Sequence, residues 1–244
     1  MLKNILVPID SSDHAKAALE SGLWLAKEFN GTLFGQHVID TVSIEGTFFQ
    51  DISGSLGFEP YFDFSTKMRE VLEERGKSIL EEFSRRCREQ GIRHETFLDM
   101  GIIGNEICER SRVADLVILG QRGINEEFST GLMGSTANSV TRKCPRPVFV
   151  STKRFKPIEQ PLLAYDGSQR ASAAMESAAE FCSQLHLPLT VLYVAKEEQM
   201  AKRVFQEARS YLGAYGHRRI IEMVLGSTTE YVLRKAPCPV FIKR

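Results

Sequence analysis

The chain repeats itself. Residues 4–40 (NILVPIDSSDHAKAALESGLWLAKEFNGTLFGQHVID) align with residues 160–196 (QPLLAYDGSQRASAAMESAAEFCSQLHLPLTVLYVAK) at a constant offset of 156. Residues 131–153 also match residues 222–244. Because the similarity recurs in order at both ends of each half, the sequence predicts two tandem copies of one module, over residues 1–153 and 158–244.

Each copy opens with a short apolar strand (ILVPI or LLAY), an Asp and a Ser suited to a helix N-cap, and an Ala-rich helix that leads to a second apolar strand. The first copy continues with a long charged helix over about 65–90, a strand near 94–98, a helix over about 105–112, the strand DLVILG, a helix over about 135–143 and the strand PVFVS. This alternation predicts a doubly wound α/β fold with a parallel sheet. Ligands bind such sheets beyond the carboxyl ends of the strands, where the winding reverses.

Composition excludes several classes of partner. The 31 basic residues balance the 31 acidic residues, so we expect no nucleic-acid partner. The chain has no apolar run near the roughly 18–20 residues of a membrane span and no secretory signal, so we expect a cytoplasmic protein without a membrane partner. Five scattered cysteines lack metal-type spacing and are interpreted as reduced thiols.

A glycine pattern follows the predicted strand DLVILG. Each copy has two glycines separated by two residues. A Gly-Ser-Thr that opens a helix follows after ten further residues in the first copy and nine in the second. Glycines allow the backbone to approach a phosphate closely, and a helix N-terminus offers free N–H groups and the positive end of its dipole. The sequence therefore predicts an anion site in each copy, and none of the histidines has a partner at catalytic or metal spacing.

On these features the chain resembles the universal stress protein family in its tandem form, in which G-x2-G-x9-G-[ST] marks the members that bind ATP. The resemblance implies two five-stranded parallel sheets with strand order 3-2-1-4-5. In the family the Asp after the first strand and its neighbours hold adenine, a residue at the end of the second strand packs on the base, and the glycine loop holds ribose and phosphates. The residues implied in the first lobe are Pro8, Ile9, Asp10, Val38, Gly120, Arg122, Gly123, Gly134, Ser135 and Thr136. Those implied in the second lobe are Tyr165, Asp166, Val194, Gly213, Gly216, His217, Arg218, Gly226, Ser227 and Thr228.

The two motifs depart from the family in different ways. The first-lobe loop is one residue longer than the motif and carries Glu126 and Glu127, which repel a triphosphate unless a divalent cation intervenes. The second lobe instead offers His217, Arg218 and Arg219. On charge alone the second lobe is the better phosphate site, while Arg122 and Arg218 either touch phosphate or are solvated.

The second lobe is short. The offset between the copies is 156 up to Val194 but 93 at the glycine loops, a difference of 63 residues. Part of this is an aromatic-rich insertion in the first lobe, residues 41–64, and the rest is where a third strand, a helix and a fourth strand belong. Either the lobe is naturally short and borrows strand pairing from elsewhere, or the written sequence omits a segment. The second explanation, which we favour, predicts a Cα–Cα separation between Leu212 and Gly213 well beyond about 3.8 Å.

Several features have a simpler interpretation. Asp10 and Asp166 can act only as helix caps, and the glycines only as turn formers. The insertion either packs over the first lobe or forms a lid or a docking surface for an unidentified protein partner. The last strands, PVFVS and PVFIK, can pair within the chain as a pseudo-dimer or between chains as a homodimer.

The sequence thus favours an ATP-binding protein of stress response or signalling, with Mg²⁺ accompanying the nucleotide and slow hydrolysis as an option. No residue stands out as a general base. An adenylating enzyme of the related α-hydrolase class is less favoured, because its S-G-G-x-D-S loop is replaced by PIDSSDH and AYDGSQR. An interaction module of the same fold that binds no nucleotide stays open.

Overall fold

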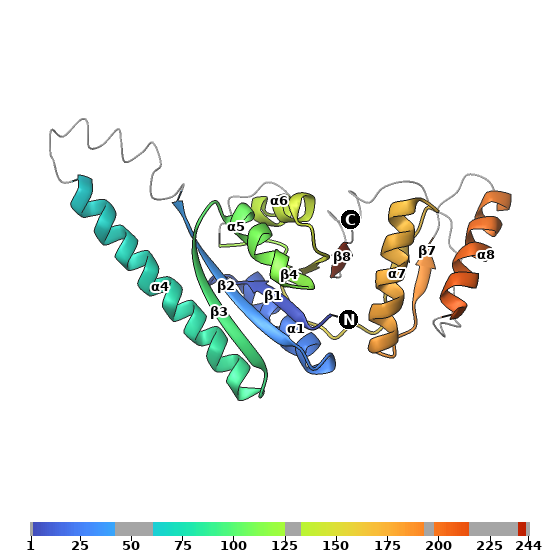
Figure 1. The fold of residues 1–244 in the computed structure, drawn as a ribbon, viewed down its shortest axis with the longest axis horizontal. Helices are drawn as coiled ribbons and strands as arrows, with labels where there is room; N and C mark the ends of the chain where they lie inside the picture. The colour runs from blue at the N-terminus through green and yellow to red at the C-terminus, as the bar shows by residue number, and fades with distance from the viewer. Residues whose placement is uncertain (1, 42–60, 125–132, 193–197, 215–238, 243–244) are drawn as a thin grey trace.

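A computed structural model describes residues 2–41, 61–124, 133–192, 198–214 and 239–242. The described strands form a six-stranded sheet in the order β3-β2-β1-β4-β5-β8 and a two-stranded sheet, β6-β7. The larger sheet belongs mainly to the first lobe, and the helices of the second lobe lie at the end of the molecule opposite the long helix α4 (Figure 1).

The five strands of the first lobe are parallel and follow the order 3-2-1-4-5, as predicted. They are β1 (Asn4–Pro8), β2 (Thr32–Asp40), β3 (Arg93–Gly101), β4 (Leu116–Gly120) and β5 (Val148–Ser151). The short apolar strands β1 and β4 are central and buried on both faces, which explains their continuous rather than alternating hydrophobicity.

Helices cover both faces of this sheet. Ile5 and Ile118 pack in one apolar cluster with residues of α1 (Asp13–Glu28) and α4 (Tyr61–Glu89). Their neighbours Leu6 and Val117 face a second cluster, with residues of α5 (Ile103–Arg110) and α6 (Ser135–Lys143) and with Ala114, which follows the 3₁₀ helix η1 (Ser111–Val113). The winding therefore reverses between β1 and β4, where the chain leaves toward opposite faces.

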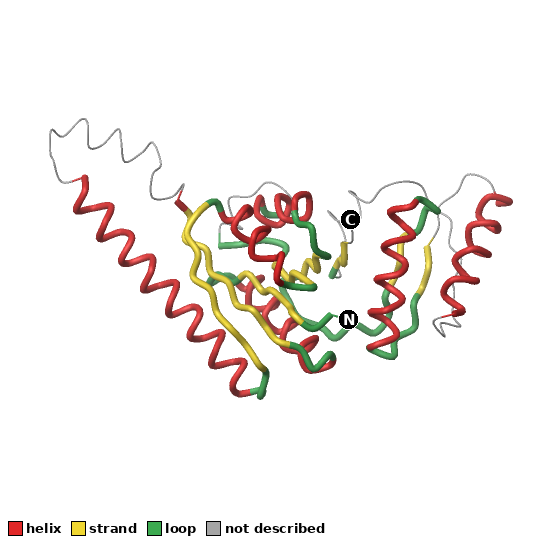
Figure 2. Tube along the Cα trace, viewed as in Figure 1, coloured by secondary structure: helices red, strands yellow, loops and turns green. Residues whose placement is uncertain are grey.

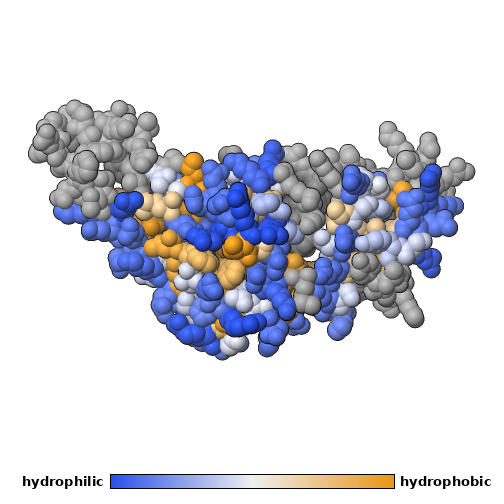
Figure 3. All heavy atoms as spheres, in the orientation of Figure 1, coloured by the Kyte–Doolittle hydropathy of each residue, from blue (hydrophilic) through white to orange (hydrophobic). Residues whose placement is uncertain are grey.

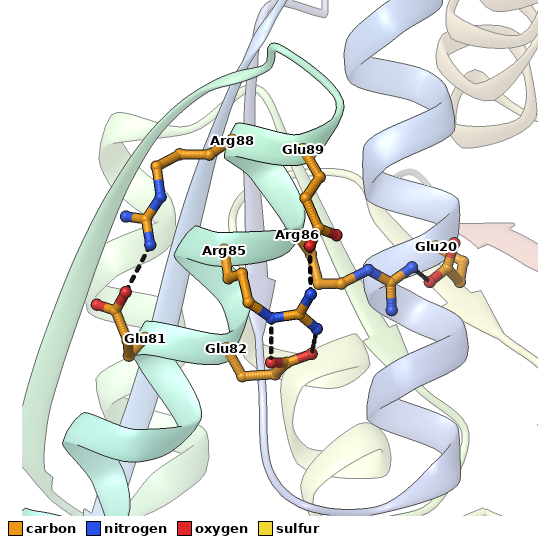
Figure 4. A network of polar contacts seen from close by, with 7 residues as sticks. All are labelled: Glu20, Glu81, Glu82, Arg85, Arg86, Arg88 and Glu89. Atoms are coloured by element: carbon orange, nitrogen blue, oxygen red, sulfur yellow. Dashed lines mark hydrogen bonds and ion pairs between the residues drawn. The ribbon is translucent and has the colours of Figure 1, made fainter.

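The long helix α4 carries a network of ion pairs. Arg85 contacts Glu82 and Glu89, and Arg88 lies 2.5 Å from Glu81, all on the exposed side of α4 (Figure 4). Such exposed pairs contribute little to stability. Arg86 instead crosses to Glu20 of α1, and both side chains are about one-third exposed, so this pair ties the two helices of one face together.

The start of α4 differs from the prediction. The helix begins at Tyr61, earlier than the predicted residue 65 or so, and its backbone takes in the last residues of the aromatic-rich insertion. Insertion residues 42–60 lie outside the described residues.

The second lobe repeats the opening unit of the first. Its described elements are β6 (Leu162–Ala164), α7 (Gln169–Gln184), β7 (Thr190–Leu192), α8 (Glu198–Ala214) and β8 (Val240–Ile242), seen as helices and strands in Figure 2. The register of β6 with β7 is that of β1 with β2 at the offset of 156: Ala164 pairs with Leu192 as Pro8 pairs with Gln36. The sequence repeat is therefore also a backbone repeat.

The last strand of the second lobe completes the sheet of the first. Strand β8 pairs antiparallel with β5, with Phe149 opposite Phe241, so the two last strands pair within the chain. Helix α8 runs through Leu212 and Gly213, and the predicted omission of a segment between them stays a prediction. The pairing of β8 with β5 is the borrowed strand pairing that the other explanation, a naturally short second lobe, requires.

The two lobes also share apolar contacts. The rings of Phe29 and Phe181 meet edge to face at 5.8 Å between centroids, and the ring of Trp24 lies 6.1 Å from that of Phe155, in the segment that joins the two lobes. In Figure 3 polar residues cover most of the described surface, while apolar residues gather around α5 and the strands beside it. Among the described residues, no helix combines the length and the apolar character that crossing a membrane requires.

The described cysteines are free thiols. Burial raises the pKa of Cys87 and of Cys182 to about 12, and that of Cys108 to about 11. These thiols are therefore protonated at neutral pH and react slowly, as expected of reduced core cysteines. Cys238 lies outside the described residues.

Candidate functional site

The segment that follows β1 is folded around the carboxylate of Asp10. Asp10 Oδ1 accepts a hydrogen bond from the backbone N–H of Ser12 at 2.8 Å, and Ser12 Oγ accepts one from the N–H of Ala15 at 3.1 Å. These bonds turn the chain and cap α1. Ser12 is therefore the N-cap of α1, whereas Asp10 holds the turn before it and does not cap the helix itself, and its second oxygen, Oδ2, takes no part in that bond.

That second oxygen lies against the glycine loop that follows β4. A Cβ atom built on Gly123 would stand 3.1 Å from Asp10 Oδ2. Gly134 closes the same loop: its N–H donates to the carbonyl of Gln121 at 2.9 Å, and a Cβ on it would lie 3.3 Å from the Cα of Arg122. The structure thus brings Asp10, Arg122, Gly123 and Gly134 together at the switch point between β1 and β4.

Gly120 has a packing role as well. It ends β4, and a Cβ built there would lie 2.7 Å from Cβ and 2.8 Å from the backbone carbon of His14 in the first turn of α1. Only a glycine lets β4 approach the helix this closely. Its predicted contact with ribose or phosphate stays a prediction.

The N-terminus of α6 points to the same region. Gly134 is its N-cap and has no capping side chain, Ser135 and Thr136 open the helix, and the first turn contains no acidic residue. The uncapped N–H groups and the positive end of the dipole suit an anion, while Arg142 and Lys143 lie in the last turn, where the dipole favours cations. The predicted helix of 135–143 is confirmed to the residue.

The ends of β1 and β2 form the other side of the site. Ile9 is buried and its N–H donates to the carbonyl of Gln36, while Pro8 and Val38 are partly buried. His37 Nδ1 lies 2.8 Å from the carbonyl oxygen of Ile9 and donates to it. The predicted adenine residues Pro8, Ile9, Asp10 and Val38 are therefore neighbours along the carboxyl edge of the sheet.

Two further residues lie here that the sequence did not single out for a role. His37 supports the carbonyl that precedes Asp10. Gln36 is fully buried and its amide donates to Asp99 at 2.8 Å and to the carbonyl of Glu106 at 3.2 Å. A glutamine inside an otherwise apolar strand was the signal available for the second.

The described part of the second lobe presents the first part of this arrangement. Asp166 Oδ1 accepts from the N–H of Ser168 at 3.0 Å, as Asp10 does from Ser12, and Tyr165 is buried. Gly213, predicted to begin the glycine loop, lies inside α8 instead. The other predicted second-lobe residues lie outside the described residues: Val194, Gly216, His217, Arg218, Gly226, Ser227 and Thr228.

The Asp166 carboxylate is stabilised in its charged form by Ser168. Hydrogen bonds from the Ser168 hydroxyl and then from its backbone N–H lower the pKa of Asp166 below its ordinary value. Within the described ranges no three His, Cys, Asp or Glu side chains gather as a metal site would require.

Comparison with known proteins places this arrangement in a family. The model of the "Universal stress protein family" matches residues 1–152 and 211–244. Universal stress protein Slr1230 of Synechocystis sp. is 26% identical over 287 aligned positions that cover all of both chains. Since this chain has 244 residues, 43 or more of those positions have no counterpart in it.

Two further relatives agree. Universal stress protein MJ0577 of Methanocaldococcus jannaschii is 27% identical over 163 residues, 63% of this chain and 97% of that protein. The crystal structure of a universal stress protein from Archaeoglobus fulgidus superposes with a TM-score of 0.73 at 21% identity, covering 98% of this chain and 97% of that one, and so shares the fold. The matched residues, the strand order and these relatives together show that the chain belongs to the universal stress protein family.

Proposed function

We propose that the first lobe binds ATP at the carboxyl ends of β1 and β4, and that the protein acts in stress response or signalling through nucleotide occupancy. The observation that carries the proposal is the meeting of Asp10 Oδ2 with Gly123 beside the uncapped N-terminus of α6. Asp10 supplies a carboxylate acceptor for the base or the ribose hydroxyls, and the N-terminus of α6 supplies N–H donors for phosphates. Both lie at the carboxyl edge of the sheet, where this fold binds ligands.

The residues present fit such a ligand. Gly123 leaves open the space beside the Asp10 carboxylate, where any side chain would enter at 3.1 Å. The first turn of α6 offers N–H donors together with the hydroxyls of Ser135 and Thr136. Bound Mg²⁺ would neutralise part of the triphosphate charge. The protein's own groups bind and orient the nucleotide, and slow hydrolysis is part of the proposal only as a secondary activity.

The first lobe is the preferred site, although charge along the sequence favours the second. In the first lobe the four elements β1, α1, β4 and α6 all reach the site. In the second lobe the Asp166 loop is present, but Gly213 lies in a helix. The position of Gly213 in a helix favours, for the second lobe alone, the alternative function of an interaction module that binds no nucleotide.

The direct test is to denature the purified protein and identify any released nucleotide by mass and ultraviolet spectrum. We expect adenine nucleotide at up to one per chain, and a rise in thermal midpoint when Mg-ATP is added to emptied protein. Absence of both would leave the interaction module as the function of the whole chain. Phosphate release from Mg-ATP, followed over hours, measures the secondary activity.

Asp10 and Asp166 offer a matched pair of variants. Asp10→Ala and Asp166→Ala each remove the same hydrogen bond to a Ser N–H two residues on, so each should cost about 1 kcal/mol of stability. Only Asp10→Ala should weaken Mg-ATP binding, by about tenfold or more, since it alone removes a charged acceptor from the site. Equal affinities for ATP in the two variants would contradict a site at Asp10.

A further inference from the structure

Among the described contacts, Arg75 is the arginine of α4 that has no carboxylate partner. The helix carries arginines at positions 69, 75, 85, 86 and 88. Four of them contact carboxylates: Arg69 with Glu73, Arg85 with Glu82, Arg86 with Glu20 and Arg88 with Glu81. Arg75 donates instead to a neutral hydroxyl, Ser11 Oγ, at 3.0 Å.

The glutamates next to Arg75 are engaged elsewhere. Glu73 lies 3.8 Å from Arg69, and Glu74 lies 2.6 Å from Lys77. Among the described residues, Arg75 is therefore the α4 arginine whose charge no carboxylate neutralises. Its guanidinium is exposed and held by one neutral bond, which a charged acceptor would replace with a stronger one.

The position of Arg75 is fixed by the packing of the next residue. A Cβ built on Gly76 would lie 2.6 Å from Leu98 Cδ1 and 2.9 Å from Cδ2 of His37, so α4 presses directly on β2 and β3 at this point. His37 in turn donates to the carbonyl of Ile9. One turn of α4 thus contacts the Asp10 segment on both sides, at Ile9 through His37 and at Ser11 through Arg75.

The second lobe lacks this feature at the equivalent place. Ser11 corresponds to Gly167, and the nearest side chain to a Cβ built on Gly167 is Val204 of α8, at 3.6 Å. The helix that follows the second strand therefore brings a cation to the Asp loop in the first lobe and an apolar residue in the second. The Arg75 guanidinium therefore lies in the lobe whose described residues form the more complete site.

From these observations we infer that Arg75 is a phosphate-binding residue of the first lobe, exchanging Ser11 Oγ for a phosphate oxygen of the bound nucleotide. This inference rests on the proposed function. A guanidinium suits phosphate because its planar set of N–H donors bonds two oxygens at once and always carries charge.

The test is calorimetric titration of the full chain with Mg-ATP and, separately, with adenosine. Arg75→Gln should weaken ATP binding by about tenfold and change adenosine binding by less than about twofold, because adenosine has no phosphate. Arg75→Lys should recover part of the ATP affinity that Arg75→Gln loses, since it keeps the charge but lacks the planar pair of donors. Arg88→Gln, an exposed arginine at the far end of α4, is the matched control and should change neither affinity.

Other outcomes overturn the inference in distinguishable ways. If Arg75→Gln weakens ATP and adenosine equally, and Ser11→Ala does the same, Arg75 only holds the loop. If Arg75→Gln binds ATP as the wild type does, the inference fails while the proposed function stands. If the wild type binds neither ligand, the proposed function fails and the inference fails with it.

Discussion

The two lobes begin alike and end differently. In both, an Asp carboxylate accepts from a Ser N–H two residues on, that Ser caps a 16-residue helix, and a residue with positive φ follows, Asn30 at 48° and His186 at 54°. The first lobe then builds five parallel strands, whereas the described part of the second lobe has two strands of its own and adds one to the sheet of the first. Local sequence therefore sets the opening unit, and the rest of the lobe decides whether a site forms around it.

The sharpest divergence is at the glycine loops. Leu119 and Gly120 end β4, whereas their counterparts Leu212 and Gly213 lie in α8. Both leucines are buried, at 3% and 0% exposure, so each lobe uses the residue as core. Strand β4 of the first lobe pairs with β1 on one side and β5 on the other. In the described part of the second lobe, the corresponding segment at Leu212 and Gly213 continues helix α8 instead.

Gly120→Ala and Gly213→Ala should have opposite effects and the largest difference. Alanine at 120 places Cβ 2.7 Å from His14 and should cost about 2 kcal/mol of unfolding free energy. Alanine at 213 replaces a helical glycine and should add about 0.5 kcal/mol. Urea unfolding of both variants measures this, and a loss of stability at 213 would show that this residue needs glycine for a reason other than helix propensity.

Cysteine labelling should separate the stability of the two lobes. Cys87 and Cys182 are both buried, at 0% and 1% exposure, and each pKa is raised to about 12. Each thiol therefore reacts with iodoacetamide only after local opening. Since β6 and β7 form only a two-stranded sheet, Cys182 should label about tenfold faster than Cys87, as read by peptide mass spectrometry. Equal rates would mean that the lobes open as one unit.

The two helix caps should be equivalent. Ser12 and Ser168 each accept from the N–H three residues on at 3.1 Å. Ser12→Ala and Ser168→Ala should therefore each lower thermal stability by about 1 kcal/mol, the usual worth of a serine N-cap. Thermal melts check this, with Ser210→Ala of α8, an exposed non-capping serine, as the control. A much larger loss for Ser12 would locate extra tertiary contacts at the first cap.

The smallest effect concerns pH. Hydrogen bonds from Ser168 lower the pKa of Asp166, so its carboxylate stabilises the fold above the unfolded pKa of about 3.9, and this contribution disappears as pH falls through the lower folded pKa. Titration of the carboxyl carbon by NMR should give a midpoint below that of free Asp. Ser168→Ala should move the midpoint upward, and an unchanged midpoint would contradict the role of the hydroxyl.

Sequence periodicity and capping residues determined the elements of the first lobe. The apolar runs of β1 and β4, the Asp-x-Ser cap and the Gly-Ser-Thr start of α6 each act within a few residues, so they are legible without the fold. Strand order, by contrast, was implied by the family resemblance and not by any local pattern. The repeat at an offset of 156 was equally visible, because register is set by the same local pattern in both copies.

Only the tertiary structure decided the contacts between distant segments. Three of these contacts join residues 64 or more positions apart: β8 with β5, Gly123 with Asp10, and Arg75 with Ser11. The helical state of Gly213 depends instead on what packs beside its segment. Side-chain identity specifies what such residues can bond, but not which of several possible partners the folded chain brings within reach. That choice is made by the close packing of strands and helices, and among the described residues it completes a candidate site around the opening unit of the first lobe.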